Sequence, residues 1–447
     1  MKMIATVILG LFVISAGLWA AEESNEAEKY WPAWRGPNAS GVAPHADPPI
    51  EWSETVNIRW KLEIPGKGHS SPIVWGDTVF VTTAIETDKP GDEKPVEAPP
   101  QQGRRRGPRG IQPSNILQFV IFGINRSDGS IRWQKTVREE LPHEGTHKTG
   151  SWASNSAVTD GTHVYAFFGS RGLYCFDMQG NLKWKKDLGD MTIKLSFGEG
   201  SSPVLYGDVI LVNWDHEGES FITALDKKTG AQRWRMERDE RTSWSTPLVV
   251  EYNGTPQVIT TATHRTRSYD LATGNLIWEC GGLTANTIPS PVAADGMVYL
   301  MSGFRGNALQ AIRLASASGD ITDSKAIAWA YDRDTPYVPS PLLYGGTLYF
   351  LKSNSRVLSC FNAKTGKAYY GPQRLDGIAE VYASPVGAGN RVYITDRDGA
   401  TLVIKHCPEF EVLAQNMLDD GFDASPAIVD NEIYLRGRSA LYCIATD

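Results

Sequence analysis

Paired cysteines are missing from this 447-residue sequence. Its five cysteines are scattered, with no adjacent pair and no Cys-x-x-Cys spacing: Cys175, Cys280, Cys360, Cys407 and Cys443. The sequence therefore contains no zinc-ribbon or dithiol redox motif. Cys175, Cys360 and Cys443 occupy matching places in three similar segments. Equivalent places in separate repeats lie far apart, so we expect small buried core residues rather than disulfides or metal ligands.

An excess of positive charge and a membrane-length apolar run are also absent. The chain has 44 Lys and Arg against 51 Asp and Glu, a net charge of −7, which favours neither nucleic acid nor an anionic membrane as partner. The apolar run 4–18 is short for a membrane span, follows Lys2 and precedes Ala20-Ala21. We predict a cleaved signal peptide over 1–21, with a membrane anchor as the alternative. No lipobox cysteine follows, so we expect a periplasmic or secreted monomer without a transmembrane segment.

Familiar catalytic motifs are lacking as well. No Gly-x-Ser-x-Gly or Walker sequence is present, and the only metal-like pattern is His-Glu-x-x-His at 143–147. That zinc motif needs a helix to bring both imidazoles to one face. Pro142 and Gly145 indicate a loop instead, and Ala153 stands where a third histidine would be. We predict no catalytic residue and no metal site, with a zinc hydrolase as the weaker alternative.

What the chain does contain is a repeat. A small residue followed by Pro opens a short apolar segment, and the pair recurs at Ser71, Ser202, Thr246, Ser290, Ser340, Ser384 and Ser425, with Ser156-Ala157 as the one variant that lacks proline. From Pro203 the steps are 44, 44, 50, 44 and 41 residues, the length of a four-stranded propeller blade. We predict an all-β, eight-bladed propeller, and we expect binding near the irregular blade at Ser156.

Each unit is predicted to be an antiparallel sheet of four strands. In the unit that starts at Ser202, the strands are expected at 202–206, 209–213, 221–226 and 231–236. A Gly turn and a tryptophan at a fixed offset recur in the fourth strand, which predicts an indole wedged between neighbouring blades. These tryptophans are Trp60, Trp133, Trp184, Trp234, Trp278 and Trp329.

The ends of the chain predict how the ring closes. The last unit is one strand short, while residues 57–64 form a fourth strand with no unit before it. Pairing the two completes the eighth blade and removes an open edge. The expected organisation is a signal peptide (1–21), an N-terminal extension (22–55) and one propeller domain (56–447). Residues 86–113 are rich in Pro and Arg and are predicted to be a flexible insertion.

The repeat also predicts a site. Loops between the second and third strands, and loops that enter each new blade, open on the same face around the axis. The first group supplies Arg171, Arg265, Arg305, Arg356, Arg397 and Arg438, and the second supplies His69, Trp152, Glu199, Trp244, Tyr337, Tyr382 and Asp423. We predict a funnel of arginines and aromatic residues suited to an anionic or planar ligand or a peptide. The alternative is that these arginines pair with neighbouring carboxylates and only fasten the loops.

The repeat resembles a known family. The Ala-Leu-Asp-x-x-Thr-Gly-x-x-x-Trp run at 224–234 and the Ser-Pro strands are similar to the tryptophan-docking repeats of quinoprotein alcohol dehydrogenases, and also to the non-catalytic propeller of the outer-membrane protein assembly machinery (BamB type). Trp-x-x-Trp-Arg-Gly-Pro at 31–37 and Tyr-Val-Pro-Ser-Pro at 337–341 resemble exported PQQ-like propeller proteins of planctomycetes.

The resemblance implies two functions. One is a non-catalytic binding or scaffold module, without a cofactor, for an envelope protein partner or an anionic small ligand. The other is a dehydrogenase that uses pyrroloquinoline quinone (PQQ) and calcium. The quinoprotein dehydrogenases carry a vicinal Cys-Cys disulfide and a calcium site, whereas this chain has no adjacent cysteines and no matching set of calcium ligands. We therefore expect the binding module, with the dehydrogenase as the alternative.

Overall fold

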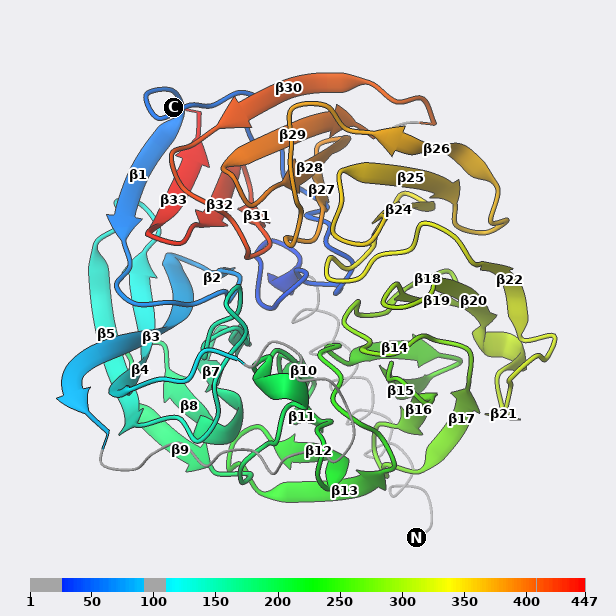
Figure 1. Cartoon of the computed structure of the whole chain (residues 1–447), viewed down its shortest axis with the longest axis horizontal. Helices are drawn as coiled ribbons and strands as arrows, with labels where there is room; N and C mark the ends of the chain where they lie inside the picture. Colours follow the sequence, from blue (N-terminus) through cyan, green and yellow to red (C-terminus); the bar gives the residue numbers. More distant parts are fainter. Residues whose placement is uncertain (1–25, 92–109, 407, 447) are drawn as a thin grey trace, which may run out of the picture.

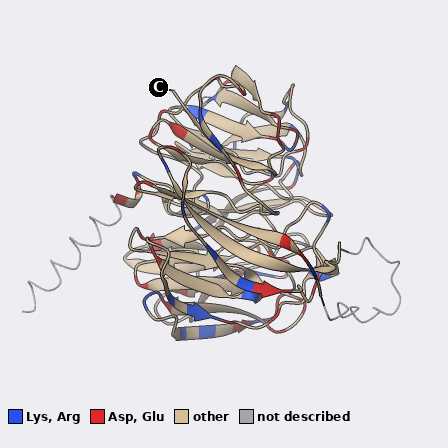
Figure 2. Ribbon diagram, turned by 90° about the vertical axis from the view of Figure 1, so that its left-hand side faces the viewer, with Lys and Arg blue, Asp and Glu red and all other residues tan. Residues whose placement is uncertain are grey.

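Eight sheets are arranged around a central axis in the computed structural model, which describes residues 26–91, 110–406 and 408–446 (Figure 1). The predicted eight-bladed propeller with four-stranded antiparallel blades is confirmed. In the side view, Lys and Arg segments and Asp and Glu segments are both scattered over the ribbons, so neither sign of charge dominates this side of the described chain (Figure 2). The predicted signal peptide lies outside the described residues. Within those residues, no helix has the length and apolar character needed to span a membrane.

The first four blades follow one another along the chain. Blade 1 contains β2 (Ile73–Trp75), β3 (Thr78–Pro90), β4 (Asn115–Asn125) and β5 (Ile131–Glu140). Blade 2 contains β6 (Val158–Thr159), β7 (His163–Phe167), β8 (Leu173–Asp177) and β9 (Leu182–Lys186). Blade 3 contains β10 (Val204–Tyr206), β11 (Val209–Trp214), β12 (Ser220–Asp226) and β13 (Gln232–Arg238). Blade 4 contains β14 (Leu248–Tyr252), β15 (Thr255–Thr260), β16 (Thr266–Asp270) and β17 (Leu276–Cys280), with β21 (Gly319–Asp320) added at its edge.

The other four blades complete the ring. Blade 5 contains β18 (Val292–Ala294), β19 (Met297–Ser302), β20 (Ala308–Arg313) and β22 (Ile327–Tyr331). Blade 6 contains β23 (Leu342–Tyr344), β24 (Thr347–Leu351), β25 (Val357–Asn362) and β26 (Ala368–Arg374). Blade 7 contains β27 (Val386–Ala388), β28 (Arg391–Thr395), β29 (Ala400–Lys405) and β30 (Val412–Met417). Blade 8 contains β31 (Ala427–Val429), β32 (Glu432–Arg436), β33 (Ala440–Ala445) and β1 (Ile58–Glu63). The short 3-10 turns are η1 (Gly169–Arg171), η2 (Lys194–Ser196) and η3 (Leu314–Ser316).

Burial follows the position of each strand in its blade. Strand β11 is buried along its whole length because both of its faces pack against neighbouring blades, whereas the outer strand β13 alternates between exposed and buried residues. A two-residue turn at Gly207-Asp208 joins β10 to β11, and Gly207 has a φ of 54° there. Glycine adopts this conformation without the steric cost that a side chain brings.

Tryptophans join successive blades, as the sequence predicts. In five of the eight junctions the indole lies on a glycine of the next blade and donates a hydrogen bond to a carbonyl there, at 2.8–3.0 Å. The pairs are Trp60 with Gly129, Trp133 with Gly180, Trp184 with Gly230, Trp234 with Gly274 and Trp329 with Gly366. Trp278 differs, because its indole donates to Gln257 of its own blade at 3.1 Å and is fully buried.

The ring closes through the two ends of the chain. Strand β1 pairs antiparallel with β33, from Ile58 opposite Ile444 to Glu63 opposite Ala440. The predicted completion of the last blade by the N-terminal strand is confirmed. Trp60 from β1 then contacts Tyr434 in the same blade and docks on blade 1, so one strand fastens the first blade to the last.

The N-terminal extension lies across the ring rather than beside it. Trp31 exchanges backbone hydrogen bonds with Val74 of blade 1, and Pro32 accepts one from Thr159 of blade 2. Farther along, Gly387 of blade 7 donates to Gly41 and accepts from Ala43. The extension is the dark blue segment near the centre of the ring (Figure 1), so one stretch of chain bridges blades 1, 2 and 7.

The boundaries of the insertion differ from the prediction. Residues 86–90, expected to lie in the flexible stretch, continue β3, and Glu86 pairs with Leu117 of β4. Thr87 also donates its hydroxyl to the carbonyl of Ile116 at 2.8 Å. Strand pairing in this long hairpin gives hydrogen-bond partners to backbone N–H and C=O groups. Composition alone does not reveal such pairing. Residues 92–109 of the predicted insertion lie outside the described residues.

Candidate functional site

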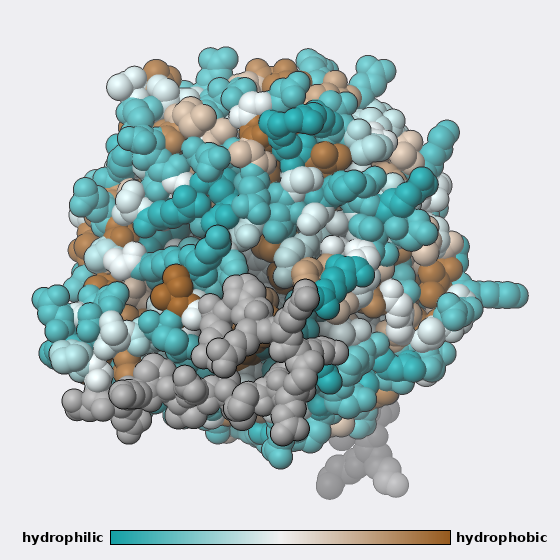
Figure 3. Space-filling view, in the orientation of Figure 1, coloured by the Kyte–Doolittle hydropathy of each residue, from teal (hydrophilic) through white to brown (hydrophobic). Residues whose placement is uncertain are grey.

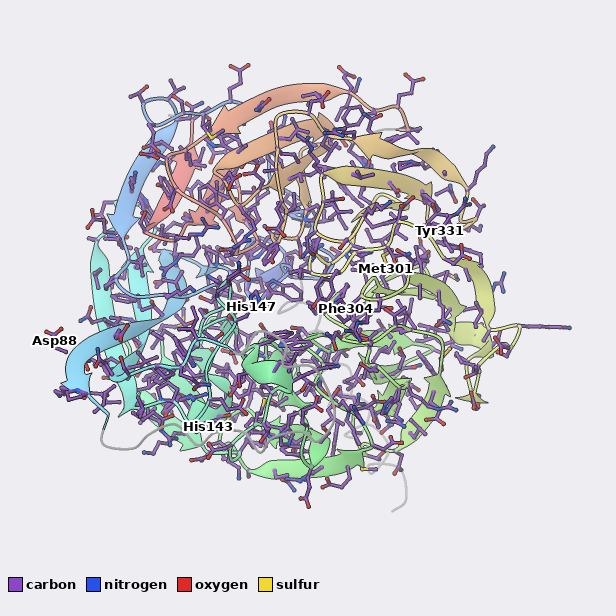
Figure 4. All side chains as sticks on the ribbon, viewed as in Figure 1. Asp88, His143, His147, Met301, Phe304 and Tyr331 are labelled. Carbon is purple, nitrogen blue, oxygen red and sulfur yellow. The ribbon has the colours of Figure 1, made fainter. Side chains whose placement is uncertain are left out.

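A cavity of about 370 Å³ opens on the axis, where the loops that enter the blades converge. Eight aromatic side chains, counting histidine, stand in its wall: Trp34, His69, His147, Phe197, Trp244, Phe304, Tyr337 and Tyr382. Phe304 and Tyr337 stack with ring centroids 4.9 Å apart. Figure 4 places His147 and Phe304 on opposite sides of the central opening, with His143 farther out. We call this cavity the funnel.

The floor of the funnel is a closed ring of hydrogen bonds made by the repeated small residue. In all eight blades the backbone N–H of this residue donates to the hydroxyl of its counterpart in the following blade, at 2.9–3.1 Å. The circuit runs through Ser71, Ser156, Ser202, Thr246, Ser290, Ser340, Ser384 and Ser425 and returns to Ser71. Seven of the eight line the funnel. We call this circuit the hydroxyl ring.

The N-terminal extension closes the channel beside the hydroxyl ring. The Arg35 guanidinium is buried and donates to the carbonyls of Pro341 and Pro385, at 2.7 Å each. Those prolines directly follow Ser340 and Ser384 of the ring, and the adjacent Trp34 lines the funnel. The extension therefore lies against the hydroxyl ring, with Trp34 in the wall of the funnel and Arg35 buried beside the ring.

The loop residues predicted from the repeat converge in part. His69, Glu199, Trp244, Tyr337, Tyr382 and Asp423 line the funnel. Trp152 does not, because its indole donates to the carbonyl of Glu144 at 3.0 Å and its ring packs against the core between blades 1 and 2. Burial raises the pKa of Tyr337, which keeps its hydroxyl neutral.

None of the six predicted arginines lines the funnel. Arg171 is 3% exposed and contacts Glu140 and Glu199, at 2.9 and 3.0 Å. Arg397 contacts Asp423 at 2.5 Å and Glu380 at 2.8 Å, and it lies 4.1 Å from the centroid of the Tyr382 ring. These guanidiniums hold the acidic wall residues in place, which matches the alternative that they fasten the loops.

The other four arginines are also engaged within the protein. Arg438 contacts Asp423 at 3.2 Å, and Arg265 contacts Asp320 at 2.9 Å. Arg356 donates to the carbonyl of Ile378 at 3.2 Å. Arg305 has a φ of 56° and lies 5.3 Å from the centroid of the Phe304 ring.

His69 is the titratable side chain of the funnel with the largest shift. Burial lowers its pKa from 6.5 to about 4, although the carboxylate of Asp423 lies 3.7 Å away and acts in the opposite direction. The desolvation of the imidazolium therefore outweighs the attraction of a carboxylate that two arginines already neutralise. His69 is neutral at pH 7.

The His-Glu-x-x-His segment forms a loop, as expected. His143 contacts the carbonyl of Met191 at 2.8 Å, while His147 contacts the hydroxyl of Thr149 at 2.7 Å and packs edge-on against Phe197. In the parts of the chain that the structure describes, no group of three or more His, Cys, Asp or Glu is arranged to hold a metal ion. Cys175, Cys280, Cys360 and Cys443 are buried, as expected for small core residues, while Cys407 lies outside the described residues.

Sequence reasoning missed four wall residues and the role of the ring. His147 and Phe197 lie in loops that enter blades 2 and 3, nine and five positions before the small residue, whereas the predicted residues precede it by two to four positions. Phe304 precedes the predicted Arg305 by one position. Trp34 belongs to the Trp-x-x-Trp-Arg-Gly-Pro motif of the N-terminal extension. This motif is not part of the repeat, so the repeat pattern does not predict its position near the axis.

Eight blades surround the funnel, and docking tryptophans fasten five of the eight junctions between them. A family model described as outer membrane protein assembly factor BamB matches residues 218–446, about half of the chain. The chain belongs to this family of PQQ-like propellers. No curated protein matches the sequence.

Solved structures share the fold at low sequence identity. BamB from Moraxella catarrhalis is 15% identical with a TM-score of 0.51, covering 81% of this chain and 98% of that one. Quinohemoprotein alcohol dehydrogenase from Comamonas testosteroni is 10% identical with a TM-score of 0.63, covering 95% and 84%. A europium-containing methanol dehydrogenase is 11% identical with a TM-score of 0.62, covering 96% and 100%.

The funnel matches only part of what a quinone held with calcium requires. Its aromatic walls suit a planar group. A calcium ion takes six to eight oxygen ligands, whereas the described residues of the wall offer two carboxylates, Glu199 and Asp423, each already paired with arginine. These residues do not fit a calcium-bound quinone.

Proposed function

We propose that this chain is an exported, non-catalytic binding module of the cell envelope, and that its funnel binds a small ligand with a planar group. The observation that supports this proposal is the aromatic wall, which surrounds a cavity of about 370 Å³. Cavities of this size accommodate small molecules, and flat aromatic faces bind planar groups with little loss of side-chain freedom. Both carboxylates of the described wall, Glu199 and Asp423, form ion pairs with arginines, which disfavours a role for them as catalytic bases.

A neutral planar probe tests this function. We expect 2-naphthamide to bind the purified protein and to quench its tryptophan fluorescence, since Trp34 and Trp244 line the funnel. Tyr337→Leu should weaken binding about tenfold, because it removes one face of the stacked Phe304–Tyr337 pair. Tyr369→Leu is the matched control, since Tyr369 is exposed on β26. Equal weakening by both variants, or no binding at all, contradicts the proposal.

Reconstitution tests the dehydrogenase alternative. Purified protein is incubated with PQQ and calcium, and the quinone absorbance and the reduction of an electron-accepting dye are followed with a range of alcohols. We expect no dye reduction. A shifted quinone spectrum together with alcohol-dependent dye reduction overturns the non-catalytic proposal.

The family favours a second candidate, a scaffold for an envelope protein, since the matching model is described as an assembly factor. A partner segment would then enter the funnel between the aromatic walls. Cross-linking in intact cells, with wild type and Tyr337→Leu compared, tests this candidate. A partner captured by the wild type and lost in the variant supports it, whereas equal capture places the partner elsewhere on the ring.

A further inference from the structure

We infer that the floor of the funnel binds an oxyanion, so that the ligand is a planar molecule carrying a carboxylate, phosphate or sulfate group. This inference rests on the proposed function and specifies the chemistry of its ligand. Two independent features support it: the unused donors of the hydroxyl ring, and two buried arginines with no carboxylate partner.

The hydroxyl ring presents donors to the funnel. Each hydroxyl accepts one backbone N–H from the preceding blade. A hydroxyl has one O–H donor in addition to its lone pairs. For none of the eight does the described part of the chain supply an acceptor for that O–H. Each hydroxyl therefore keeps one O–H donor that a bound anion or its bound water can accept, and seven of the eight residues line the funnel.

Arg436 is the first of the two arginines. It is 1% exposed, and none of its three guanidinium nitrogens has a hydrogen-bond partner among the described residues. Burial lowers its pKa to about 10, and Asp420 is the carboxylate whose charge opposes this shift. A buried guanidinium without a partner is costly, and a bound anion reduces that cost.

The position of Arg436 links it to the funnel. It ends β32 two residues after Tyr434, so both side chains project from the same face of the strand. That face packs against blade 1, because Tyr434 belongs to a cluster that includes Val79 and Phe122. The charge of Arg436 also contributes to the lowered pKa of His69, which lines the funnel. Arg438, two residues farther along the chain, contacts the wall residue Asp423 at 3.2 Å, so Arg436 lies near the wall on the blade 1 side of blade 8.

Arg35 supplies the second unpaired charge. Its hydrogen bonds go only to carbonyls, those of Ser40, Pro341 and Pro385, and burial lowers its pKa to about 9. The two acidic residues of the wall, Glu199 and Asp423, are already neutralised by Arg171 and by Arg397 with Arg438. The charge left uncompensated around the floor is thus positive.

A matched pair of probes separates the anion from the planar body. We expect 2-naphthoate to bind about tenfold more tightly than 2-naphthamide in tryptophan-fluorescence titrations, because a charged acceptor gains more from donors and cations than a neutral amide does. Arg436→Met should bring this ratio close to one while leaving naphthamide binding unchanged. Arg333→Met is the control, because that guanidinium is exposed, and it should leave the ratio at about ten.

Stability measurements show whether the variant folds. Because Arg436 lacks hydrogen bonds, Arg436→Met should keep or raise the melting temperature without ligand, and it should lose the rise that sulfate or phosphate gives in the wild type. Equal binding of both probes by the wild type overturns the anion inference but leaves the proposed function intact. A lowered melting temperature of Arg436→Met also overturns it, because the guanidinium then has partners within the protein. Absence of binding by either probe contradicts the proposed function itself.

Discussion

The contact between tryptophan and glycine makes a prediction that two glycines of one blade can test. Gly274 and Gly254 both lie in blade 4 and have nearly the same φ, 76° and 74°. A Cβ on Gly274 would lie 2.8 Å from the Trp234 ring, whereas a Cβ on Gly254 would meet nothing within 4 Å. Alanine at either position incurs the cost of a left-handed backbone, about 1 kcal/mol. Only at Gly274 does it also displace an indole.

The cost of that displacement can be estimated. Trp234 is 9% exposed and donates to the carbonyl of Leu271 at 2.8 Å, so moving it strains packing and weakens a hydrogen bond. Overpacking of this kind costs about 1–3 kcal/mol. We expect Gly274→Ala to lower the free energy of unfolding by about 3 kcal/mol and Gly254→Ala by about 1 kcal/mol.

Equilibrium unfolding in urea, followed by far-UV circular dichroism, measures both losses. The two variants must show the wild-type dependence on urea, so that a change in midpoint reports a change in stability. Equal losses at the two positions would refute the contribution of docking to stability and leave only the backbone term.

Three further predictions follow from the funnel. Ser384→Ala should cost about 1–3 kcal/mol of stability, because it leaves the buried N–H of Ser340 without an acceptor, and Ser384→Thr should restore most of it. Arg397→Met should lower the free energy of unfolding by about 3 kcal/mol, because it leaves Asp423 less well paired. Arg305→Met should change it by less than about 0.5 kcal/mol. Thermal or urea unfolding measures both changes. As pH falls from 6.5 to about 4, His69 should contribute a loss of up to about 3 kcal/mol, because the unfolded chain binds its proton first; His69→Gln should remove this part of the pH profile.

The architecture could be predicted from the sequence because the repeat carries it. The small-Pro pairs fix the number of blades, and the unpaired fourth strand before Ile64 predicts the closure that β1 and β33 form. The docking tryptophans were predicted for the same reason, since Gly and Trp recur at a fixed offset. Trp278 departs because blade 5 has the turn η3 where five of the other blades have the docking glycine.

The site could be predicted only as far as the backbone repeats. Wall residues next to the small-Pro pair, such as Trp244 and Asp423, follow from their position in the unit. The direction in which a long side chain points does not follow from its position in the unit. Arg171 occupies a loop that faces the funnel, yet η1 turns it between Glu140 and Glu199. An arginine pairs with a carboxylate that the neighbouring blade can supply. The sequence of a single repeat unit does not specify that carboxylate.

The variant blade shows which part of the small-Pro pair builds the floor. Ser156 is followed by Ala157 instead of proline, yet its hydroxyl accepts from Ser71 and its N–H donates to Ser202, both at 2.9 Å. The hydroxyl is therefore what the ring requires, since the circuit continues where proline is lost. Proline contributes a carbonyl without an N–H of its own, and Arg35 uses two of these carbonyls. The residue that marks each blade in the sequence thus closes the ring with its N–H and its hydroxyl oxygen, and in seven blades it lines the funnel.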